Sequence, residues 1–228
     1  MASLTWLGHS AFRLDTDSGK RIYVDPFLNG NPKTPESELE PERVDIIALT
    51  HGHGDHVGDT AGLKKKFPDG EIVALVELKA WLGKQGVDIG QMPGPNKGGT
   101  QTIDGTQFTL VNAFHSSSSD DGDYLGEAAG IVIRDGSLSI YFAGDTCVFG
   151  DMALIARLYK PTVAVLPIGD HFTMGPEEAA VALELLGDPR CIPCHWGTFG
   201  LLTGTPDKLA SLTKAQVDRI EPGDTVQL

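Results

Sequence analysis

Short apolar runs separated by polar turns characterise the N-terminal part of the chain. Residues 4–7, 11–14 and 20–24 are apolar or alternating segments, which predicts three strands. Residues 44–49 form a short, largely apolar run rich in β-branched side chains, which is typical of a buried strand. Residues 29–43 are rich in Pro, Glu and Asn, which indicates a surface loop between these strands.

The rest of the chain alternates between strand and helix patterns. Further strands are predicted at residues 71–76, 106–113, 129–134, 138–142, 162–167, 190–194 and within 216–228. Helices are predicted at residues 59–66, 77–85, 151–159 and 176–186, with one more opening at 205. This order predicts an α/β protein with two packed sheets and helices outside them. We expect one domain, residues 1–228, because two-sheet architectures of this length are often undivided.

The end of the buried segment 44–49 carries a dense polar run, Thr50-His51-Gly52-His53-Gly54-Asp55-His56. Imidazole is the commonest metal ligand near neutral pH, and a neighbouring carboxylate suits a divalent ion. Gly52 and Gly54 lack a Cβ atom, so the backbone can turn sharply and direct several side chains to one point. A polar surface loop gives no reason for this spacing, and the run therefore predicts a metal site at a strand end.

Other candidate ligands follow other predicted strands. His115 follows residues 106–113, Asp145 follows 138–142 and His195 follows 190–194, so that five of the seven histidines belong to this set. Together these side chains suffice for two ions with an open position for water. A carboxylate can bridge two cations about 3.5–4 Å apart, and Asp145 is the natural choice for that position.

The sequence leaves several roles open. Asp25, which Pro26 follows, either accepts a hydrogen bond from a ligand histidine or only caps a turn. His9, between two strands, either faces the site or makes a structural hydrogen bond. Cys191 and Cys194 have CxxC spacing, but Pro193 between apolar stretches favours free buried thiols over a redox pair.

Composition narrows the classes of function. With 18 basic and 31 acidic residues the net charge is −13, and an acidic surface repels phosphate backbones, so nucleic-acid binding is disfavoured. Bound metals would offset part of this negative charge locally, so the net charge does not exclude a small phosphorylated substrate. No apolar run reaches the length of a membrane span, and residues 1–7 lack the features of a signal peptide. The number of cysteines, three, is odd and excludes a complete disulfide framework, so we expect a cytoplasmic protein. The sequence does not decide whether the protein forms a homo-oligomer.

The HxHxDH run, a later lone histidine, an aspartate at a strand end and a final histidine resemble the metallo-β-lactamase superfamily. The resemblance extends over the whole chain and includes Asp25. The segments 6–10, 25–27, 114–116, 143–146 and 172–179 resemble uncharacterised metal-dependent hydrolases (UPF0173-like) related to the ascorbate-6-phosphate lactonase group. The segment His195-Trp196-Gly197-Thr198-Phe199 is also similar to the N-acyl-phosphatidylethanolamine phospholipase D branch.

This resemblance implies a four-layer αββα sandwich with the site at one edge. It assigns one metal ion to His51, His53, His115 and Asp145. It assigns a second ion to Asp55, His56, Asp145 and His195. The residue types are compatible with zinc, manganese, iron or nickel, and the affinity order alone does not choose among them.

Departures from the family pattern narrow the expected chemistry. Redox di-iron members carry Glu at the position of His53 and add a flavin domain that is absent here, so hydrolysis is favoured. The phospholipase branch has a catalytic histidine just before the helix that begins near Pro176. Here that place holds Thr173-Met174-Gly175, and only His171 lies nearby. The chain also lacks the basic arm of the transfer-RNA-processing members.

The function expected from these residues is metal-dependent hydrolysis by a metal-bridging hydroxide, on a phosphodiester or another small phosphorylated substrate. Asp55 would orient the hydroxide or take its proton, and His171 would stabilise developing charge or protonate a leaving group. A lactonase acting on a sugar-derived lactone uses the same chemistry and is the alternative. A metal-binding regulatory protein without turnover is a second alternative, which the full ligand set disfavours.

Overall fold

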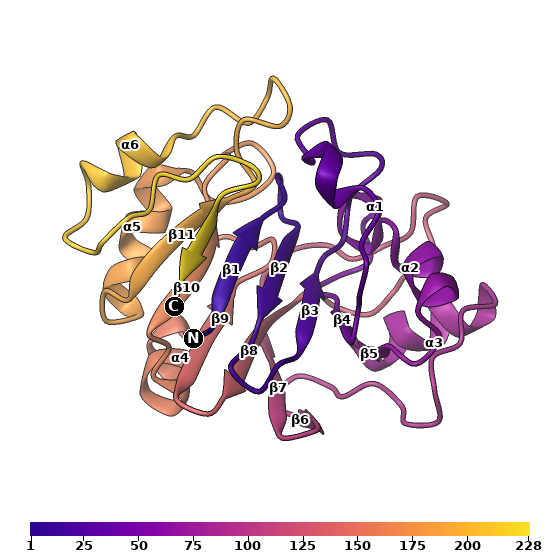
Figure 1. Ribbon diagram of the computed structural model, residues 1–228. Helices are drawn as coiled ribbons and strands as arrows, with labels where there is room; N and C mark the ends of the chain where they lie inside the picture. The colour runs from indigo at the N-terminus through magenta and orange to yellow at the C-terminus, as the bar shows by residue number, and fades with distance from the viewer.

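The computed structural model describes residues 1–228 and consists of two six-stranded sheets packed face to face, with helices on both outer sides (Figure 1). The first sheet has the order β12-β1-β2-β3-β4-β5 and the second β11-β10-β9-β8-β7-β6. The strands are β1 Ser3–Trp6, β2 Phe12–Asp15, β3 Arg21–Val24, β4 Ile46–Ala48, β5 Glu71–Val73, β6 Thr100–Ile103, β7 Thr106–Asn112, β8 Ala129–Asp135, β9 Leu138–Phe142, β10 Val163–Pro167, β11 Arg190–Cys194 and β12 Thr225–Gln227. The helices are α1 Gly54–Val57, α2 Thr60–Lys66, α3 Val76–Lys84, α4 Met152–Tyr159, α5 Pro176–Leu185 and α6 Pro206–Ala210, with a 3-10 turn at Glu36–Glu38.

Three buried clusters hold the four layers together. The cluster between the sheets has 22 buried residues, among them Leu4, Phe12, Ile131 and Phe142. A cluster of 18 residues lies between the second sheet and helices α4 and α5, and one of 13 between the first sheet and helices α2 and α3. Burial of this apolar surface is the main driving force for the layered arrangement. The αββα sandwich expected from the sequence is confirmed.

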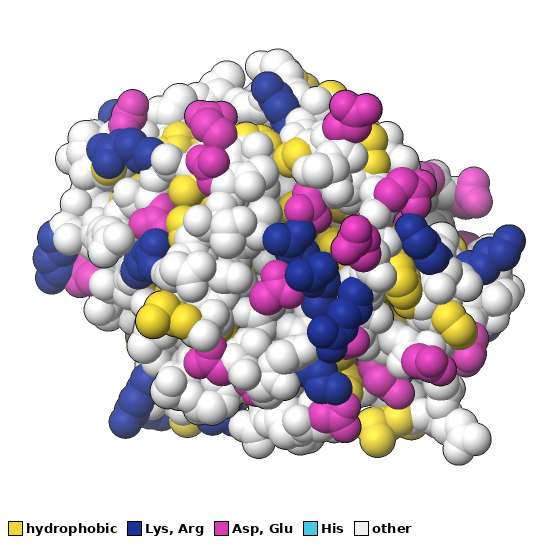
Figure 2. Space-filling model, in the orientation of Figure 1, with side chains coloured by type: hydrophobic (Ala, Val, Ile, Leu, Met, Phe, Trp, Pro, Cys, Tyr) yellow, Lys and Arg dark blue, Asp and Glu magenta, His cyan; other side chains and the backbone are white.

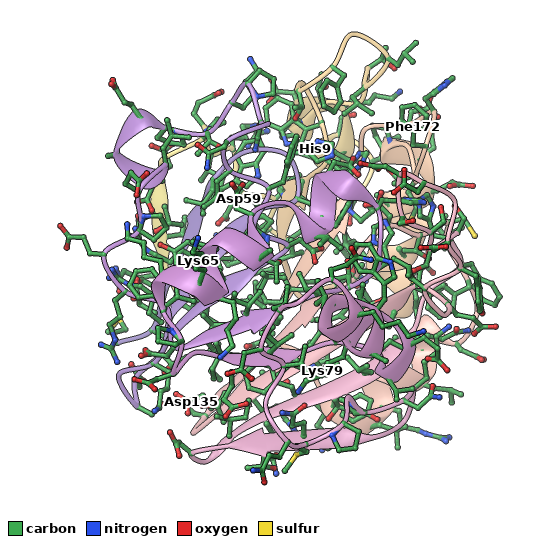
Figure 3. All side chains as sticks on the ribbon, turned by 90° about the vertical axis from the view of Figure 1, so that its right-hand side faces the viewer. His9, Asp59, Lys65, Lys79, Asp135 and Phe172 are labelled. Atoms are coloured by element: carbon green, nitrogen blue, oxygen red, sulfur yellow. The ribbon has the colours of Figure 1, made fainter.

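Strand direction decides where the polar strand ends meet. β3, β4 and β5 run parallel in the first sheet, and β9, β10 and β11 run parallel in the second. The carboxyl ends of these strands reach one edge of the sandwich, the position where ligands bind in open α/β sheets. Figure 3 shows His9 and Phe172 at this edge and Asp135 at the opposite one.

Most predicted elements are present, with changes at their ends. The strand predicted at residues 71–76 ends at Val73, because the chain turns into helix α3 at Val76. The last predicted strand shrinks to Thr225–Gln227 and pairs with β1. Strand β6 and helix α1 were not predicted, since β6 is a polar edge strand and α1 has only four residues. The free, buried state of Cys191 and Cys194 agrees with the sequence.

Basic side chains on the outer face of the first sheet are paired with carboxylates. Figure 2 shows a row of Lys and Arg down the middle of this face with Asp and Glu beside it. Arg13 and Arg21 both bind the Asp15 carboxylate, over Nε–O distances of 3.1 and 2.7 Å, and Arg13 also binds Glu38. This pairing neutralises the row. None of the helices combines the length and apolar character that crossing a membrane requires.

Candidate metal centre

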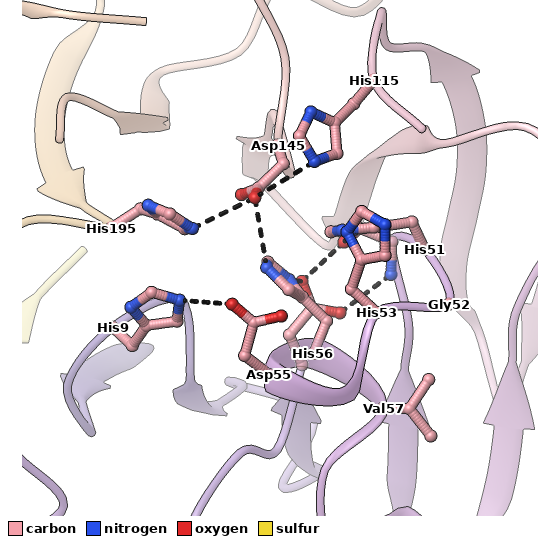
Figure 4. Close-up of polar contacts among 12 residues, drawn as sticks. His9, His51, Gly52, His53, Asp55, His56, Val57, His115, Asp145 and His195 are labelled. Carbon is pink, nitrogen blue, oxygen red and sulfur yellow. Dashed lines mark hydrogen bonds and ion pairs between the residues drawn. The ribbon is translucent and has the colours of Figure 1, made fainter. Parts of the chain in front are cut away.

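Four connections place the candidate ligands at the edge where the parallel strands end. The loop after β4 carries His51 and His53 and continues into helix α1, which presents Asp55 and His56. His115, Asp145 and His195 follow strands β7, β9 and β11. Residues distant in sequence therefore converge because their strands end together, as the close-up shows (Figure 4).

The ligand atoms form three overlapping groups, and within each group the atoms lie within 4.8 Å of one another. These groups are His51, His53 and His115; His9, Asp55, His56 and His195; and His51, His56 and Asp145. The structure thus brings all seven predicted metal residues together, and it adds His9. The first two groups correspond to the two ion sites that the family resemblance implies, each without Asp145.

Asp145 lies between these two groups. Its Oδ2 atom is 3.1 Å from Nε2 of His195, 3.4 Å from Nε2 of His56 and 3.7 Å from Nε2 of His115. The carboxylate is buried, and its pKa lies well below the ordinary value. Burial alone would raise this pKa, but the opposite effect of His195 and His56 is larger. Asp145 is therefore a carboxylate in reach of both groups.

Unpartnered polar atoms indicate that these residues fit metal ions. Oδ1 of Asp145 is buried and has no hydrogen-bond partner, and the buried Nε2 of His56 makes no hydrogen bond, with only the 3.4 Å ion-pair contact to Oδ2 of Asp145. Buried polar atoms are nearly always paired, so orphaned atoms inside a cluster of nitrogen and oxygen donors require an explanation. An ion held between them would satisfy both atoms, and imidazole with carboxylate is a donor set for a divalent metal.

The histidines of the first group are in the protonation state that metal binding needs. Burial lowers the pKa of His51 well below its ordinary value, and burial also lowers the pKa of His53 and His115. Neutral imidazole is the form that coordinates a metal. These three side chains are therefore prepared for an ion at neutral pH.

Asp25 orients one of the ligands. It adopts a left-handed conformation, with φ of 46°, immediately after β3. Its carboxylate accepts hydrogen bonds from the backbone N–H and the hydroxyl of Thr50, at 2.8 and 2.6 Å, and lies 2.8 Å from Nδ1 of His56. The contact with Nδ1 leaves Nε2 of His56 to face the cluster, so of the two roles open for Asp25 the structure shows the hydrogen bond to a candidate ligand histidine.

His9 faces the site. Its Nε2 atom is 3.0 Å from Oδ2 of Asp55, and its backbone oxygen accepts hydrogen bonds from the indole of Trp6 and from the backbone of His195. Burial, the largest cause, lowers the pKa of His9 to about 4, so the ring is neutral at pH 7 and donates to Asp55. The pKa of Asp55 is lowered: burial raises it, but the His9 hydrogen bond and the charge of His56 outweigh this.

A cavity of about 290 Å³ opens onto this cluster. It is lined by His53, Asp55, His115, Ser116, Asp145, Phe172, His195 and Phe199. His171 is exposed and packs edge-on against Phe172, with ring centroids 4.5 Å apart, so Phe172 rather than His171 contributes to the lining. The catalytic role of His171 stays a prediction. Sequence reasoning missed Phe172 and Phe199, although both follow strand ends in Gly-containing loops.

Comparisons with known proteins agree with this geometry. Residues 20–196 match the sequence model of the beta-lactamase superfamily domain, and the chain therefore belongs to this superfamily. Within it, the chain belongs with the UPF0173 metal-dependent hydrolases. It is 45% identical over 228 residues to such a hydrolase of Koribacter versatilis, covering 97% of this chain and 96% of the relative. It is 46% identical over 235 residues to one of Herpetosiphon aurantiacus, with the same coverage.

A solved structure extends the likeness to three dimensions. Igni18, described as a novel metallo hydrolase from the hyperthermophilic archaeon Ignicoccus hospitalis, is 34% identical to this chain. The two structures superpose with a TM-score of 0.87 over 99% of this chain and 97% of Igni18. The protein is thus a metal-dependent hydrolase, and its His and Asp cluster is the candidate metal site.

Proposed function

We propose that this centre hydrolyses a small uncharged ester or lactone and holds two divalent ions. The main support for this proposal is that no Lys or Arg side chain lines the metal cavity. Proteins usually hold phosphate and carboxylate groups with the forked donors of Arg or with Lys. A cavity without such donors supports an uncharged carbonyl substrate.

When bound, the metal ions would lower the pKa of a water molecule and polarise the substrate oxygen. The side chains of the protein prepare the site for this. Asp55, held at 3.0 Å by His9, has one oxygen fixed and is the proposed acceptor for the proton of the attacking water. Asp25 fixes the ring of His56, and Asp145 joins the two ligand groups. We also propose that His171, whose ring packs against the cavity residue Phe172, protonates a leaving group.

Hydrolysis of a phosphodiester is the second candidate function. Two ions sharing one carboxylate suit an in-line displacement at phosphorus, because each ion can stabilise one of the two oxygens. The position of Asp145 between both ligand groups favours this reaction. The cavity lining has no Lys or Arg side chain. A phosphodiester would therefore depend on the metal ions to balance its charge, whereas an uncharged ester or lactone would not.

Zinc or manganese is the proposed metal, with iron and nickel as further candidates, because imidazole and carboxylate ligands suit each of them. A small molecule is the proposed substrate, in view of the cavity volume of about 290 Å³. The net charge of −13 and the paired basic row on the first sheet favour such a substrate over nucleic acid. We propose a cytoplasmic location and one domain over residues 1–228.

A substrate panel tests the reaction type. Protein loaded with each metal in turn is assayed with p-nitrophenyl acetate, γ-butyrolactone and bis-p-nitrophenyl phosphate, and Asp145→Ala protein serves as the background. We expect a higher kcat/KM for one of the carbonyl substrates than for the phosphodiester. A higher kcat/KM for the phosphodiester would replace the first candidate with the second. Absence of turnover above the Asp145→Ala background with every metal would contradict both.

A further inference from the structure

We propose that Phe172 and Phe199 form an apolar subsite that takes an uncharged aryl or alkyl group of the substrate beside the scissile bond. This inference rests on the proposed function and narrows its substrate class. Both side chains line the metal cavity together with His195 and Asp145. Phe172 is 51% exposed and Phe199 42% exposed, so each ring offers an uncovered part to a ligand.

The loop between β10 and α5 fixes Phe172 relative to the metal ligands. Asp170 and His171 both have left-handed φ angles, 67° and 58°, which are uncommon for residues with a side chain and cluster at functional sites. The backbone N–H of Met174 donates to the oxygen of Thr146, the neighbour of Asp145. Phe172 therefore belongs to a loop that is tied to the strand end carrying the shared carboxylate.

The loop after β11 fixes Phe199 in a similar way. Its ring packs edge-on against His9, with centroids 5.3 Å apart. Close backbone contacts hold this loop against the loop of Phe172: a Cβ on Gly204 would lie 1.6 Å from the oxygen of Ile168, and one on Gly169 would lie 2.0 Å from that of His195. Neither glycine has room for a side chain, so the two loops that carry the aromatic walls are held against each other.

The charge and size of the cavity define the group that fits between these walls. The polar lining residues offer imidazole, carboxylate and one hydroxyl, Ser116, but no cationic side chain. An anionic group between the two aromatic rings would face apolar surface with no Lys or Arg side chain in the lining, and would lose part of its hydration. The volume of about 290 Å³ lies at the lower end of ligand cavities, roughly 300–1,000 Å³. A small uncharged apolar group meets both conditions.

Ligand binding tests the subsite without turnover. The probes are N-benzylacetamide, its 4-carboxy derivative and N-methylacetamide, and their dissociation constants are measured by ligand-observed NMR on metal-loaded protein. We expect N-benzylacetamide to bind most tightly. Phe172→Ala and Phe199→Ala should each weaken its binding about tenfold, because each removes one aromatic contact. Phe172→Leu should keep part of the affinity, and metal content should be unchanged in all variants.

Leu201→Ala is the matched control, because Leu201 is 55% exposed in the same loop as Phe199 but does not line the cavity. It should bind N-benzylacetamide like the original protein. Unchanged binding in both Phe→Ala variants, or tighter binding of the 4-carboxy derivative, would overturn the subsite.

A turnover assay separates this inference from the proposed function. We expect the ratio of kcat/KM for benzyl acetate to that for methyl acetate to fall in both Phe→Ala variants, mainly through KM. If neither ester is hydrolysed but N-benzylacetamide binding depends on Phe172, the proposed function fails and the subsite stands. If both esters are hydrolysed with a ratio that no variant changes, the function stands and the subsite is overturned.

Discussion

The two edges of the sandwich, each with a cavity, differ in how their polar groups are satisfied. The cavity at the edge opposite the metal cluster is the larger one, about 520 Å³ against about 290 Å³. It lies where strands β3, β4 and β5 begin, and its three basic side chains are paired: Lys20 with Asp104 at 2.5 Å, Arg43 with Asp45 at 2.7 Å and Lys66 with Glu40 at 2.8 Å. At the metal edge, buried ligand atoms of His56 and Asp145 lack hydrogen-bond partners.

The two edges also differ in the backbone conformation of their polar residues. His9, Asp25 and His195 at the metal edge all have left-handed φ angles, which cost free energy for residues with side chains. At the opposite edge, the left-handed residues lie in short connections: Asp104 in the tight turn between β6 and β7, Lys160 at the end of α4 and Asp188 between α5 and β11. Cavity volume is therefore a poor guide to the functional site of this fold. A cluster of His and Asp side chains with unpaired buried nitrogen and oxygen atoms, together with local strain, identifies the metal edge.

The largest expected effect is that of Asp145→Ala. Because this carboxylate lies between both ligand groups, its loss should weaken both metals together and lower kcat/KM on the order of 10³-fold or more. Metal analysis should fall from near two ions per chain in the original protein to well below that value. A variant that kept one tightly bound ion and near-normal turnover would show that Asp145 is not shared.

Asp135→Ala provides the control from the opposite edge. Asp135 is also a buried aspartate, but its carboxylate accepts hydrogen bonds from Ser18 and Thr106, both at 3.2 Å. Its removal leaves the buried hydroxyl of Thr106 unpaired and should lower the free energy of unfolding by about 1–3 kcal/mol. Metal content and kcat should be unaffected. A loss of metal in this variant would indicate that the two edges are coupled.

The next largest effect is expected for His171→Ala. If His171 protonates the leaving group, its loss should lower kcat about 10²-fold with metal content unchanged. The alternative is that the ring only packs against Phe172, as the edge-on contact at 4.5 Å allows. Packing alone predicts a lower Tm with kcat little altered. Metal stoichiometry, Tm and kcat measured on the same preparation decide between these roles.

A smaller effect is expected for Asp25→Asn, which keeps the size of the side chain and suits a left-handed backbone. Asn lacks the negative charge that faces Nδ1 of His56, so the imidazole is held and polarised less strongly. Loss of such an orienting partner typically weakens metal affinity about 10- to 100-fold. Competition with a metal chelator measures the affinity. An unchanged value would mean that Thr50 alone positions this part of the site.

The comparison of the edges also explains how much the sequence could predict. The positions of His51, His53, His115 and His195 at strand ends were evident, because each follows an apolar run that must be a buried strand. Their convergence required only that parallel strands end at one edge. The orienting role of Asp25 was one of two alternatives, since its contact with His56 depends on a backbone angle that sequence does not specify.

Other features depend on tertiary packing. His9 contacts Asp55 across 46 positions of sequence, and the carbonyl group that fixes its backbone binds His195 from the other sheet. The aromatic walls depend on the contacts of Gly169 and Gly204 with other loops, which local pattern does not reveal. Strand β6 was missed because its polar sequence gains stability only by pairing with β7 at the edge of the sheet.

The smallest effect is expected at the opposite edge, for Lys20→Ala. Lys20 and Asp104 form an ion pair at 2.5 Å, but the Asp104 side chain is 68% exposed, so water screens the attraction. The free energy of unfolding should change by less than about 1 kcal/mol, and the change should shrink further at high salt. Denaturant unfolding of Lys20→Ala, Asp104→Ala and the double variant isolates the interaction energy of the pair. Metal content and kcat/KM should match the original protein in all three variants. If any of them lost activity, the larger cavity would have a functional role. The pairing of charged side chains would then no longer distinguish the opposite edge from the metal edge.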